Sequence, residues 1–370
     1  MRVLVTGGAG FIGSHTADRL VELGHDVVVL DALTAPVHRN GRPNYLTPGA
    51  ELWVGDVRNK ELLANLLRRV DAVYHFAAYQ DYLTDFSRFT STNVESTALL
   101  FEIAVTEQLD LQRIVVASSQ SAMGEGLYSC PRDGQQAPDM RPETVLTSGD
   151  WEHRCPSCSG PLEMMRTPES FSHPQNPYGM SKYGQEMVAI NLGRRYGIPT
   201  VALRYSIVQG PRQSIFNAYS GACRIFCLHY LLGSAPILYE DGAMIRDYVN
   251  IHDVVDANEL VLTDADAVGR VFNVGGGTAY TTAEFADVVR ARYGSDEQAR
   301  VSGEYRFGDT RHIHSDIEAL RGLGWEPKRT PADSVSEYAE WLEGMEGLDH
   351  VLAEADAKMR KLGVVRQARR

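Results

Sequence analysis

The chain has 370 residues, 44% of them hydrophobic, which is enough to bury the core of one large α/β domain and a smaller lobe. Its formal net charge of -12 argues against a nucleic-acid partner, because binding to a phosphate backbone needs a basic surface. The sequence has no apolar run near the roughly 20 residues that span a bilayer and no signal peptide pattern, so we expect a cytoplasmic protein without membrane contacts.

Short apolar runs alternate with amphipathic segments of helix length over residues 1–205. The runs of strand length are Val3–Thr6, Asp26–Leu30, Ala50–Val54, Ala72–Phe76, Arg113–Ala117 and Thr200–Tyr205. The segments with helical apolar spacing are Ser14–Glu22, Lys60–Arg69, Thr92–Glu107 and Lys182–Tyr196. Strands that alternate with helices form right-handed βαβ units, so we predict a Rossmann domain with a doubly wound parallel sheet.

Two later regions depart from this pattern. Residues 124–174 are rich in Pro, Gly, Ser, Cys and charged residues and are too long for an ordinary connection, so they are predicted to be an insertion. Residues 206–345 are predicted to form mainly a smaller α/β substrate lobe, with part of 236–275 returning to the Rossmann domain. Its predicted elements are helices at Ala218–Leu232, Thr282–Tyr293 and Pro331–Gly344 and strands at Ile237–Tyr239 and Val271–Val274. Residues 346–370 have the apolar spacing of a helical tail.

A glycine-rich turn joins the first strand to the first helix. In TGGAGFIG, Gly7, Gly10 and Gly13 allow a tight turn, a close approach of backbone N–H groups to a pyrophosphate, and close packing of helix on strand. Asp31 ends the next strand, where its carboxylate can accept hydrogen bonds from the adenosine ribose and repel a 2′-phosphate. The pattern therefore favours NAD over NADP.

The chemical centre is predicted at YGMSK, which places Tyr178 and Lys182 one helical turn apart on the same face. A nearby ammonium stabilises tyrosinate, so we expect the pKa of Tyr178 to be lowered and the phenol to act as a general base. Ser119 follows a predicted strand at the carboxyl edge of the sheet. Together the three residues suit oxidation of a secondary alcohol.

These motifs resemble those of the extended short-chain dehydrogenase/reductase family, specifically its NAD-dependent nucleotide-sugar epimerase/dehydratase group. The resemblance covers about residues 1–342. The matching motifs, in family order, are TGGAGFIGS, Gly55-Asp56-Val57, HFAA at His75–Ala78, Asn93-Val94, SSQSAMG, YGMSK, RYSIVQGPRQS, EDGAMIRDYVNIHDV, FNVGGG and GDTRH.

The resemblance implies roles for further residues. Ser119, Tyr178 and Lys182 would act on the sugar, and Ser121, Gln209, Asn217, Arg246 and Arg311 would bind the nucleotide sugar, the two arginines at its diphosphate. The cofactor, a tightly bound NAD, would be contacted by Gly7, Gly10, Phe11, Ile12, Gly13, Asp31, Asp56, Val57, Ala77, Ala78, Asn93, Tyr178 and Lys182.

The loop after Ser119 favours epimerisation within this group. Family dehydratases carry an Asp-Glu pair directly after this residue, whereas here Gln120 and Ser121 follow, and the nearest acid, Glu125, lies beyond Gly124. We therefore predict a 4-epimerase that oxidises the sugar at C4 and returns the hydride to the other face. The alternatives are a UDP-sugar 4-epimerase of the galactose or glucuronate type, an NAD-dependent 4-keto-sugar reductase, and a catalytically silent NAD-binding regulator.

The insertion narrows the substrate class by resemblance. YSCPRDG, CPSCSG, PQNPYGMSK and NAYSG are similar to elements of bacterial dTDP-L-rhamnose 4-epimerases, which implies a dTDP-6-deoxyhexose such as dTDP-L-rhamnose as substrate. Two positions differ from the usual pattern: Met123 stands where a Tyr is usual, and Ile207 where an Asn is usual.

The insertion also holds a candidate zinc site. Cys155 and Cys158 have the spacing of a zinc knuckle, and Cys130 could supply a third thiolate. The fourth ligand stays open between Asp133, His153 and His173, and free thiols in a mobile lid are the alternative. Such a metal would be structural.

The helices predicted at Thr92–Glu107 and Lys182–Tyr196 are apolar on a wide face. The resemblance implies that this pair forms a four-helix bundle with a second copy, so we expect a homodimer.

Overall fold

A computed structural model describes residues 1–217 and 221–369. Residues 218–220, which belong to the predicted helix Ala218–Leu232 and to the NAYSG motif, and the final residue lie outside the described residues. Among the described residues, no helix combines the length and the apolar character needed to cross a membrane.

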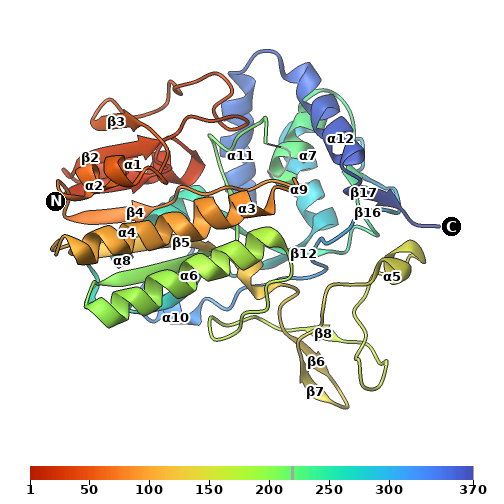
Figure 1. Cartoon of the computed structure of the whole chain (residues 1–370). Coiled ribbons are helices and arrows are strands. Elements are labelled where there is room, and N and C mark those ends of the chain that lie inside the picture. The colour runs from red at the N-terminus through yellow and green to blue at the C-terminus, as the bar shows by residue number, and fades with distance from the viewer. Residues whose placement is uncertain (218–220, 370) are drawn as a thin grey trace.

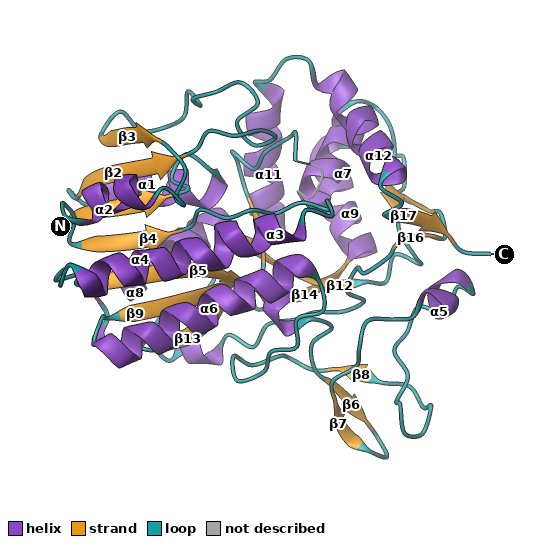
Figure 2. Cartoon of the chain, in the orientation of Figure 1, coloured by secondary structure: helices purple, strands orange, loops and turns teal. Residues whose placement is uncertain are grey.

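A seven-stranded parallel sheet forms the larger part of the molecule, in the order β13-β9-β5-β4-β1-β2-β3 (Figures 1 and 2). Its strands are β1 (Arg2–Thr6), β2 (Asp26–Asp31), β3 (Ala50–Val54), β4 (Ala72–His75), β5 (Arg113–Ser119), β9 (Thr200–Tyr205) and β13 (Val271–Val274). The chain runs outward from β1 in both directions, so the predicted doubly wound Rossmann architecture is confirmed.

Helices cover both faces of the sheet because its strands are apolar on both sides. One layer contains α2 (Lys60–Leu67), α4 (Ser96–Thr106) and α6 (Pro177–Tyr196), and the other α1 (Phe11–Glu22), α8 (Ile251–Thr263) and α10 (Glu318–Arg321). Along β1, Val3 and Val5 are buried on one face and Leu4 on the other, following the two-residue period of a strand.

The predicted helix Thr92–Glu107 is not continuous. The chain forms α3 (Phe86–Phe89), then a π-helical turn, η1 (Thr90–Glu95), and only then α4. Asn93 lies in the π-helical turn and is fully buried; its side chain bonds both backbone groups of Tyr79 and the hydroxyl of Ser181. The wider turn thus joins the loop after β4 to α6.

A smaller lobe packs beyond the carboxyl edge of the sheet. Its strands are β10 (Ile207–Gln209), β12 (Ile245–Asn250) and β14 (Ala279–Thr281) in one sheet and the pair β11 (Ile237–Leu238) and β15 (Arg300–Val301). Its helices are α7 (Ala222–Leu231), α9 (Thr282–Tyr293) and α11 (Pro331–Glu343). Two short 3-10 turns follow helices in the chain: η3 (Ala265–Ala267) after α8 and η4 (Leu348–His350) after α11. The tail forms α12 (Val351–Lys361) and β17 (Val365–Gln367), which pairs with β16 (Glu304–Arg306).

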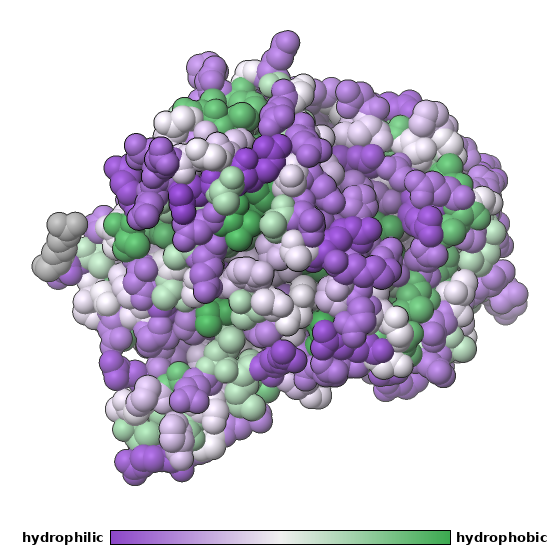
Figure 3. Space-filling view, turned by 180° about the vertical axis from the view of Figure 1, so that it is seen from behind, coloured by the Kyte–Doolittle hydropathy of each residue, from purple (hydrophilic) through white to green (hydrophobic). Residues whose placement is uncertain are grey.

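The insertion forms a separate lobe that projects from the body, at the lower right in Figure 1 and the lower left in the view from behind (Figure 3). It follows η2 (Gln120–Met123) and contains β6 (Tyr128–Cys130), β7 (Gly134–Gln136), α5 (Glu143–Thr147) and β8 (Glu163–Met164). We call residues 124–174 the inserted lobe. Its own apolar cluster has only four buried residues: Tyr128, Cys130, Cys155 and Leu162.

Candidate functional site

The glycine turn between β1 and α1 has the geometry of a phosphate-binding loop. Gly7 has φ 68°, and a Cβ there would lie 2.7 Å from the backbone nitrogen of Ala77, so no side chain fits. The first intrahelical bond of α1 runs from Ser14 N–H to Gly10 C=O at 2.9 Å. The helix therefore leaves the N–H groups of residues 11–13 unused, and they present the positive end of the helix dipole.

Asp31 ends β2 beside this turn and is buried. Its carboxylate accepts hydrogen bonds from the backbone N–H groups of Ala9 at 3.1 Å and Leu33 at 2.9 Å, which hold the side chain against the loop. His38, which the sequence analysis did not single out, is buried with its Nε2 3.6 Å from Asp31 Oδ1. Burial lowers the pKa of His38, against the opposing effect of Asp31.

The other residues expected at the cofactor follow the carboxyl ends of the strands. Asp56 pairs with Arg58 at 2.6 Å, a hydrogen bond that lowers the pKa of Asp56, and Val57 is buried in the core. Ala77 follows β4 against Gly7, with its N–H bonded to Thr6 Oγ1 at 3.2 Å, and Ala78 is exposed.

Ser119 and the first turn of α6 come together at the carboxyl edge of β5. Asn176 caps α6 by accepting a hydrogen bond from Gly179 N–H at 2.7 Å, and Pro177 occupies the first turn. Tyr178 follows it directly, and its phenol hydrogen-bonds Ser119. Lys182, one turn later, is buried and donates from Nζ to Gln185 Oε1 at 2.6 Å. The structure thus brings two of the three predicted catalytic residues, Ser119 and Tyr178, into hydrogen-bond contact.

The pKa of Tyr178 differs from the sequence-based expectation that Lys182 lowers it. Burial raises the pKa of Tyr178 to about 12, against the opposing hydrogen bond of Ser119. Burial also lowers the pKa of Lys182 to about 7. In the chain alone, desolvation therefore outweighs the expected effect of the lysine ammonium on the phenol, because Lys182 itself is only partly charged near neutral pH.

Several polar atoms near Ser119 are buried without a hydrogen-bond partner. They are Oε1 of Gln120, Oγ of Ser121, and both side-chain polar atoms of Gln209. Ser121 follows β5 and Gln209 ends β10, just beyond the neighbouring strand β9, which pairs with β5 up to Ser119 and Tyr205. Buried polar groups are normally paired, so these atoms are available to a polar ligand or to water. Asn217, also expected at the substrate, is buried.

Arginines gather around the phenol of Tyr82. Arg306 donates from Nη1 to Tyr82 Oη at 3.0 Å and shares Asp309 with Arg246, whose Nη2 lies 3.4 Å from Oδ1 of that carboxylate. Burial raises the pKa of Tyr82, while Arg306, Arg224 and Arg246 act on it in the opposite direction. We call Arg224, Arg246 and Arg306 the arginine cluster. Arg246 and Arg306 share the carboxylate of Asp309, and guanidinium groups are suited to bind a diphosphate.

Arg224 is the member with unused donors. Its side chain is completely buried on α7, where Nη1 donates to the carbonyl of Ile215 at 2.7 Å. Its Nε and Nη2 have no hydrogen-bond partner. Burial lowers the pKa of Arg224, as is expected when a buried cation has no carboxylate beside it.

Arg311, which the resemblance assigned to the diphosphate, is not part of this cluster. Its guanidinium is completely buried and forms ion pairs with Glu152, Glu240 and Asp241. Its carbonyl accepts a hydrogen bond from Arg246 Nη1 at 3.0 Å. In this structure Arg311 is therefore engaged within the protein and supports Arg246, while Arg306 lies beside Arg246 instead.

Arg224 and Arg306 were not singled out from the sequence, although signals for both were present. Arg224 interrupts the apolar run of α7, between Cys223 and Phe226, where a charge needs a reason. Arg306 precedes Asp309 by three residues, a spacing at which a turn can hold an ion pair, and the structure gives 2.6 Å between them.

The predicted cysteines of the inserted lobe are also brought together. The ligand atoms of Cys130, Asp133, Cys155 and Cys158 all lie within 4.8 Å of one another. His153 instead bonds Glu125 at 2.9 Å, and His173 bonds Asp139 at 3.0 Å. Of the three candidates for a fourth ligand, the structure thus places Asp133 with the thiols.

Residues 3–145 and 154–275 match the model of the NAD dependent epimerase/dehydratase family. The chain belongs to this family. The match includes the glycine turn, Ser119, Tyr178 and Lys182, whose arrangement is described above.

Relatives span nearly the whole chain. A dTDP-L-rhamnose 4-epimerase of Burkholderia thailandensis is 32% identical over 92% of this chain and 94% of its own length. A putative UDP-glucose 4-epimerase of Methanocaldococcus jannaschii is 30% identical over 92% of this chain and 98% of its own length.

Solved structures agree on the fold. The UDP-glucose 4-epimerase of Thermotoga maritima, crystallised with UDP-glucose, has a TM-score of 0.75 and 28% identity over 93% of this chain and 99% of its own. The UDP-glucose 4-epimerase of Thermus thermophilus, in complex with NAD, has a TM-score of 0.71 and 27% identity over 93% of this chain and 99% of its own.

Proposed function

We propose that the protein is an NAD-dependent nucleotide-sugar 4-epimerase acting on a dTDP-6-deoxyhexose such as dTDP-L-rhamnose. The observation that carries this proposal is the hydrogen-bonded pair of Tyr178 and Ser119, with Lys182 one turn away, next to buried polar atoms that have no partner. This arrangement offers a base, a hydrogen-bonding hydroxyl and a polar site for a sugar.

The glycine turn supports NAD as the resident cofactor. A Cβ at Gly7 would strike the backbone of Ala77, and α1 leaves its first N–H groups unused, so the turn can admit a pyrophosphate. The buried carboxylate of Asp31 disfavours a 2′-phosphate. When bound, NAD would accept the C4 hydride and later return it, and its charged nicotinamide ring would favour the phenolate of Tyr178.

The residues of the chain then have separate tasks. The phenolate of Tyr178 would remove the proton of the C4 hydroxyl, and Ser119 would hydrogen-bond the same oxygen as a carbonyl forms. After the 4-keto sugar has turned its other face, Tyr178 would give the proton back, so neither base nor cofactor is consumed. Gln120 and Ser121, which follow Ser119, cannot supply the acid and base that an elimination of water needs, which favours epimerisation over dehydration.

The arginine cluster supports a nucleoside diphosphate as the other end of the substrate. Arg246 and Arg306 are held in place by Asp309, and Arg224 brings two unpaired donors. Bidentate hydrogen bonds from guanidinium groups suit phosphate oxygens. The deoxythymidine base and the 6-deoxy sugar are supported by the name of the relative from Burkholderia thailandensis and by the resemblance of the motifs in the inserted lobe to those of bacterial dTDP-L-rhamnose 4-epimerases.

Turnover without added cofactor tests this function. The purified enzyme is incubated with dTDP-L-rhamnose, dTDP-glucose, UDP-galactose and GDP-mannose in deuterated buffer, and products are followed by NMR. We expect conversion of the dTDP-6-deoxyhexose at C4 without solvent deuterium at that carbon, and about one NAD released per chain on denaturation. Conversion of UDP-galactose alone would favour a UDP-sugar epimerase, a need for stoichiometric reduced cofactor a reductase, and bound NAD without turnover a regulator.

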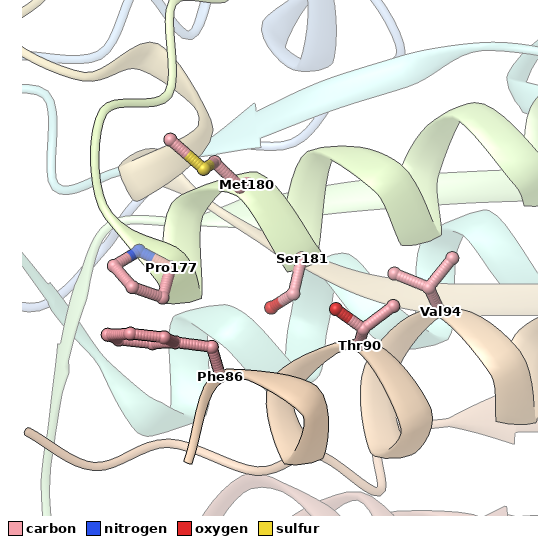
Figure 4. Close-up of a pocket in the computed structure, with 6 residues that line it drawn as sticks. All are labelled: Phe86, Thr90, Val94, Pro177, Met180 and Ser181. Atoms are coloured by element: carbon pink, nitrogen blue, oxygen red, sulfur yellow. The ribbon is translucent and has the colours of Figure 1, made fainter. Parts of the chain in front are cut away.

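We also propose a homodimer in the cytoplasm. On α3 and α6, Phe86, Met180 and Met187 are 56%, 56% and 45% exposed. A groove of about 430 Å³ lies between these helices, lined by Phe86, Thr90, Val94, Pro177, Met180 and Ser181 (Figure 4). Met180 and Met187 are two turns apart and share one side of α6, so an apolar stripe lies uncovered.

The mass of the protein in solution tests the dimer. We expect twice the chain mass at micromolar concentration, and a single chain mass for the variant Met180→Glu/Met187→Glu. Val301→Glu, at a 57% exposed position on β15, is the matched control and should leave the dimer intact. A wild-type protein with the mass of one chain contradicts the proposal.

A further inference from the structure

Four side chains from two separate segments of the inserted lobe meet at one point. Cys130 ends β6, Asp133 lies in the turn before β7, and Cys155 and Cys158 lie in the loop that precedes β8. The sulfurs of Cys130 and Cys158 are 3.5 Å apart, and Asp133 Oδ2 lies 3.1 Å from Cys155 Sγ and 3.5 Å from Cys130 Sγ. We propose that Cys130, Asp133, Cys155 and Cys158 form a structural zinc site.

The spacing of the four ligand atoms fits a tetrahedral ion. Two thiolates bound at about 2.3 Å to tetrahedral zinc are about 3.8 Å apart, and a thiolate and a carboxylate oxygen slightly less. The observed separations are close to these values, whereas a disulfide would bring two sulfurs to about 2.05 Å. The set contains soft thiolates and one hard oxygen, ligands that zinc accepts together.

The backbone around the thiols has the form of a metal knuckle. The N–H groups of Arg132 and Asp133 hydrogen-bond the sulfur of Cys130, and that of Gly160 hydrogen-bonds the sulfur of Cys158. The turn after Cys158 is tight: Ser159 has φ 59°, and its N–H bonds the carbonyl of Cys155 at 2.8 Å. Such N–H donors offset the charge that thiolates keep when they bind a metal.

The inserted lobe has only a small apolar cluster around the four ligands. Its apolar cluster contains two of the proposed ligands, Cys130 and Cys155, together with Tyr128 and Leu162, and its strands have three residues or fewer. A small segment with so few buried apolar residues is commonly stabilised by a metal. The ion would join the hairpin of β6 and β7 to the loop before β8, and four protein ligands leave no position for catalysis.

The site is connected to the arginine cluster through the same lobe. Glu125 accepts hydrogen bonds from His153 at 2.9 Å and from the backbone N–H of Arg311 at 2.9 Å, and Glu152 pairs with the guanidinium of Arg311. Because Glu152 and His153 directly precede the knuckle, loss of the ion should weaken the contacts of Glu152 and Glu125 with Arg311, whose carbonyl holds Arg246. This consequence alone rests on the proposed function; metal binding does not.

Metal analysis of the intact enzyme tests the site directly. We expect about one zinc per chain in protein purified without chelator. In this protein Cys130, Cys155 and Cys158 should resist alkylation until a strong chelator is added, as mapped by mass spectrometry. A protein that contains no zinc and takes up none when zinc is added overturns the proposal, and so does a disulfide between Cys130 and Cys158.

Variants assign the ligands. Cys155→Ser/Cys158→Ser should lose the zinc, whereas Cys223→Ala/Cys227→Ala, which removes the buried thiol pair of α7, should keep it. Asp133→Asn should weaken zinc retention against a competing chelator at least tenfold. Equal zinc in both double variants overturns the site, and undiminished retention in Asp133→Asn overturns the fourth ligand.

The activity of the same variants distinguishes the two proposals. With the metal lost, we expect the KM for the nucleotide sugar to rise severalfold while bound NAD remains, because the glycine turn lies in the other domain. If no nucleotide sugar is turned over but zinc is bound as described, the proposed function fails and the zinc site stands.

Discussion

Lys182 at the carboxyl edge of the seven-stranded sheet and two arginines in and beneath the inserted lobe are buried in opposite ways. At the sheet edge, Lys182 is buried with a neutral amide, Gln185, as its hydrogen-bond partner. In the inserted lobe and the loops beneath it, Arg141 and Arg311 are buried against the carboxylates of Glu240 and Glu152. Burial lowers the pKa of Lys182, whereas the two arginines are neutralised in ion pairs.

This difference separates the two tasks of the site. A buried lysine without a counter-ion has a protonation equilibrium near neutral pH, which suits proton transfer. Buried ion pairs keep their charge and hold loops in a fixed position, which suits the binding of a charged substrate. Under the proposed function, the chemistry would take place at the sheet edge and the lobes would position the diphosphate.

The largest expected effect comes from removing the base. Tyr178→Phe should lower kcat by about 10²–10⁴, the usual contribution of a general base, while bound NAD and the thermal midpoint stay unchanged. Steady-state kinetics with NAD quantified after denaturation measure this. Tyr183→Phe, five residues along the same helix, is the control and should retain activity. A decrease of kcat by less than tenfold in Tyr178→Phe would contradict a catalytic role for this residue at the sheet edge.

The second prediction concerns the cost of the unpaired lysine. Burial lowers the pKa of Lys182 from 10.5 to about 7, so between these pH values the unfolded chain binds more protons than the folded one, and stability rises with pH. Below pH 7 the folded protein carries the whole free-energy cost of a buried ammonium, on the order of 5 kcal/mol.

Lys182→Met should therefore stabilise the cofactor-free protein at pH 6, with a gain that shrinks as the pH rises from 7 to 10. Denaturant unfolding at pH 6, 8 and 10 measures the difference from the wild type. Lys328→Met, at a lysine whose side chain is 69% exposed, should give no such trend. A gain that is the same at all three pH values would mean that Lys182 is not a buried charge.

The third prediction tests whether the arginine cluster binds the substrate. Arg224→Gln should raise the KM for the nucleotide sugar about ten- to a hundredfold, the value of a hydrogen bond to a charged group, with kcat and bound NAD unchanged. Arg292→Gln, on the neighbouring helix α9, is the matched control. An unchanged KM, with the thermal midpoint raised, would show that Arg224 is a buried charge without a ligand.

The smallest effect is expected at the edge of the inserted lobe. Glu152 is 49% exposed, and its hydrogen bond with His312, then its pairing with Arg311, lower the pKa of Glu152 to about 2. Glu152→Gln should raise KM only two- to fivefold, because a half-exposed pair contributes about 1 kcal/mol or less and Arg311 keeps its other partners. Kinetics of Glu163→Gln, an exposed position on β8, provide the control. A larger rise in KM would mean that the pair of Glu152 and Arg311 contributes as much as the buried pair of Glu240 and Arg311.

The architecture of the sheet was predictable because its signals are local. Each strand is an apolar run followed by a turn, and the glycine turn after β1 fixes where the first helix starts. The interruption of the predicted helix Thr92–Glu107 was not predictable in this way. The π-helical turn depends on the buried bonds of Asn93 to Tyr79 and Ser181, which are 14 and 88 residues away.

The candidate site shows the same limit. Short motifs indicated Ser119, Tyr178 and the cysteines as candidates. Whether an arginine is free to bind a ligand depends instead on partners that are distant in the sequence. Arg311 is enclosed by Glu152 and Glu240, which lie 159 and 71 residues from it, so its sequence context does not reveal that it is engaged. The pKa of Tyr178 likewise follows from burial by the whole fold and not from the spacing of Lys182.

The π-helical turn at Thr90–Glu95 makes the length of this segment matter. An α-helix advances about 100° per residue, so deleting one residue from the turn would rotate Phe86 and the rest of α3 by that angle relative to α4. It would also turn Asn93 away from Tyr79 and Ser181. A deletion of one residue, which an exposed loop would tolerate, would thus change the register of the helix here. Insertions and deletions among relatives should therefore avoid these six residues.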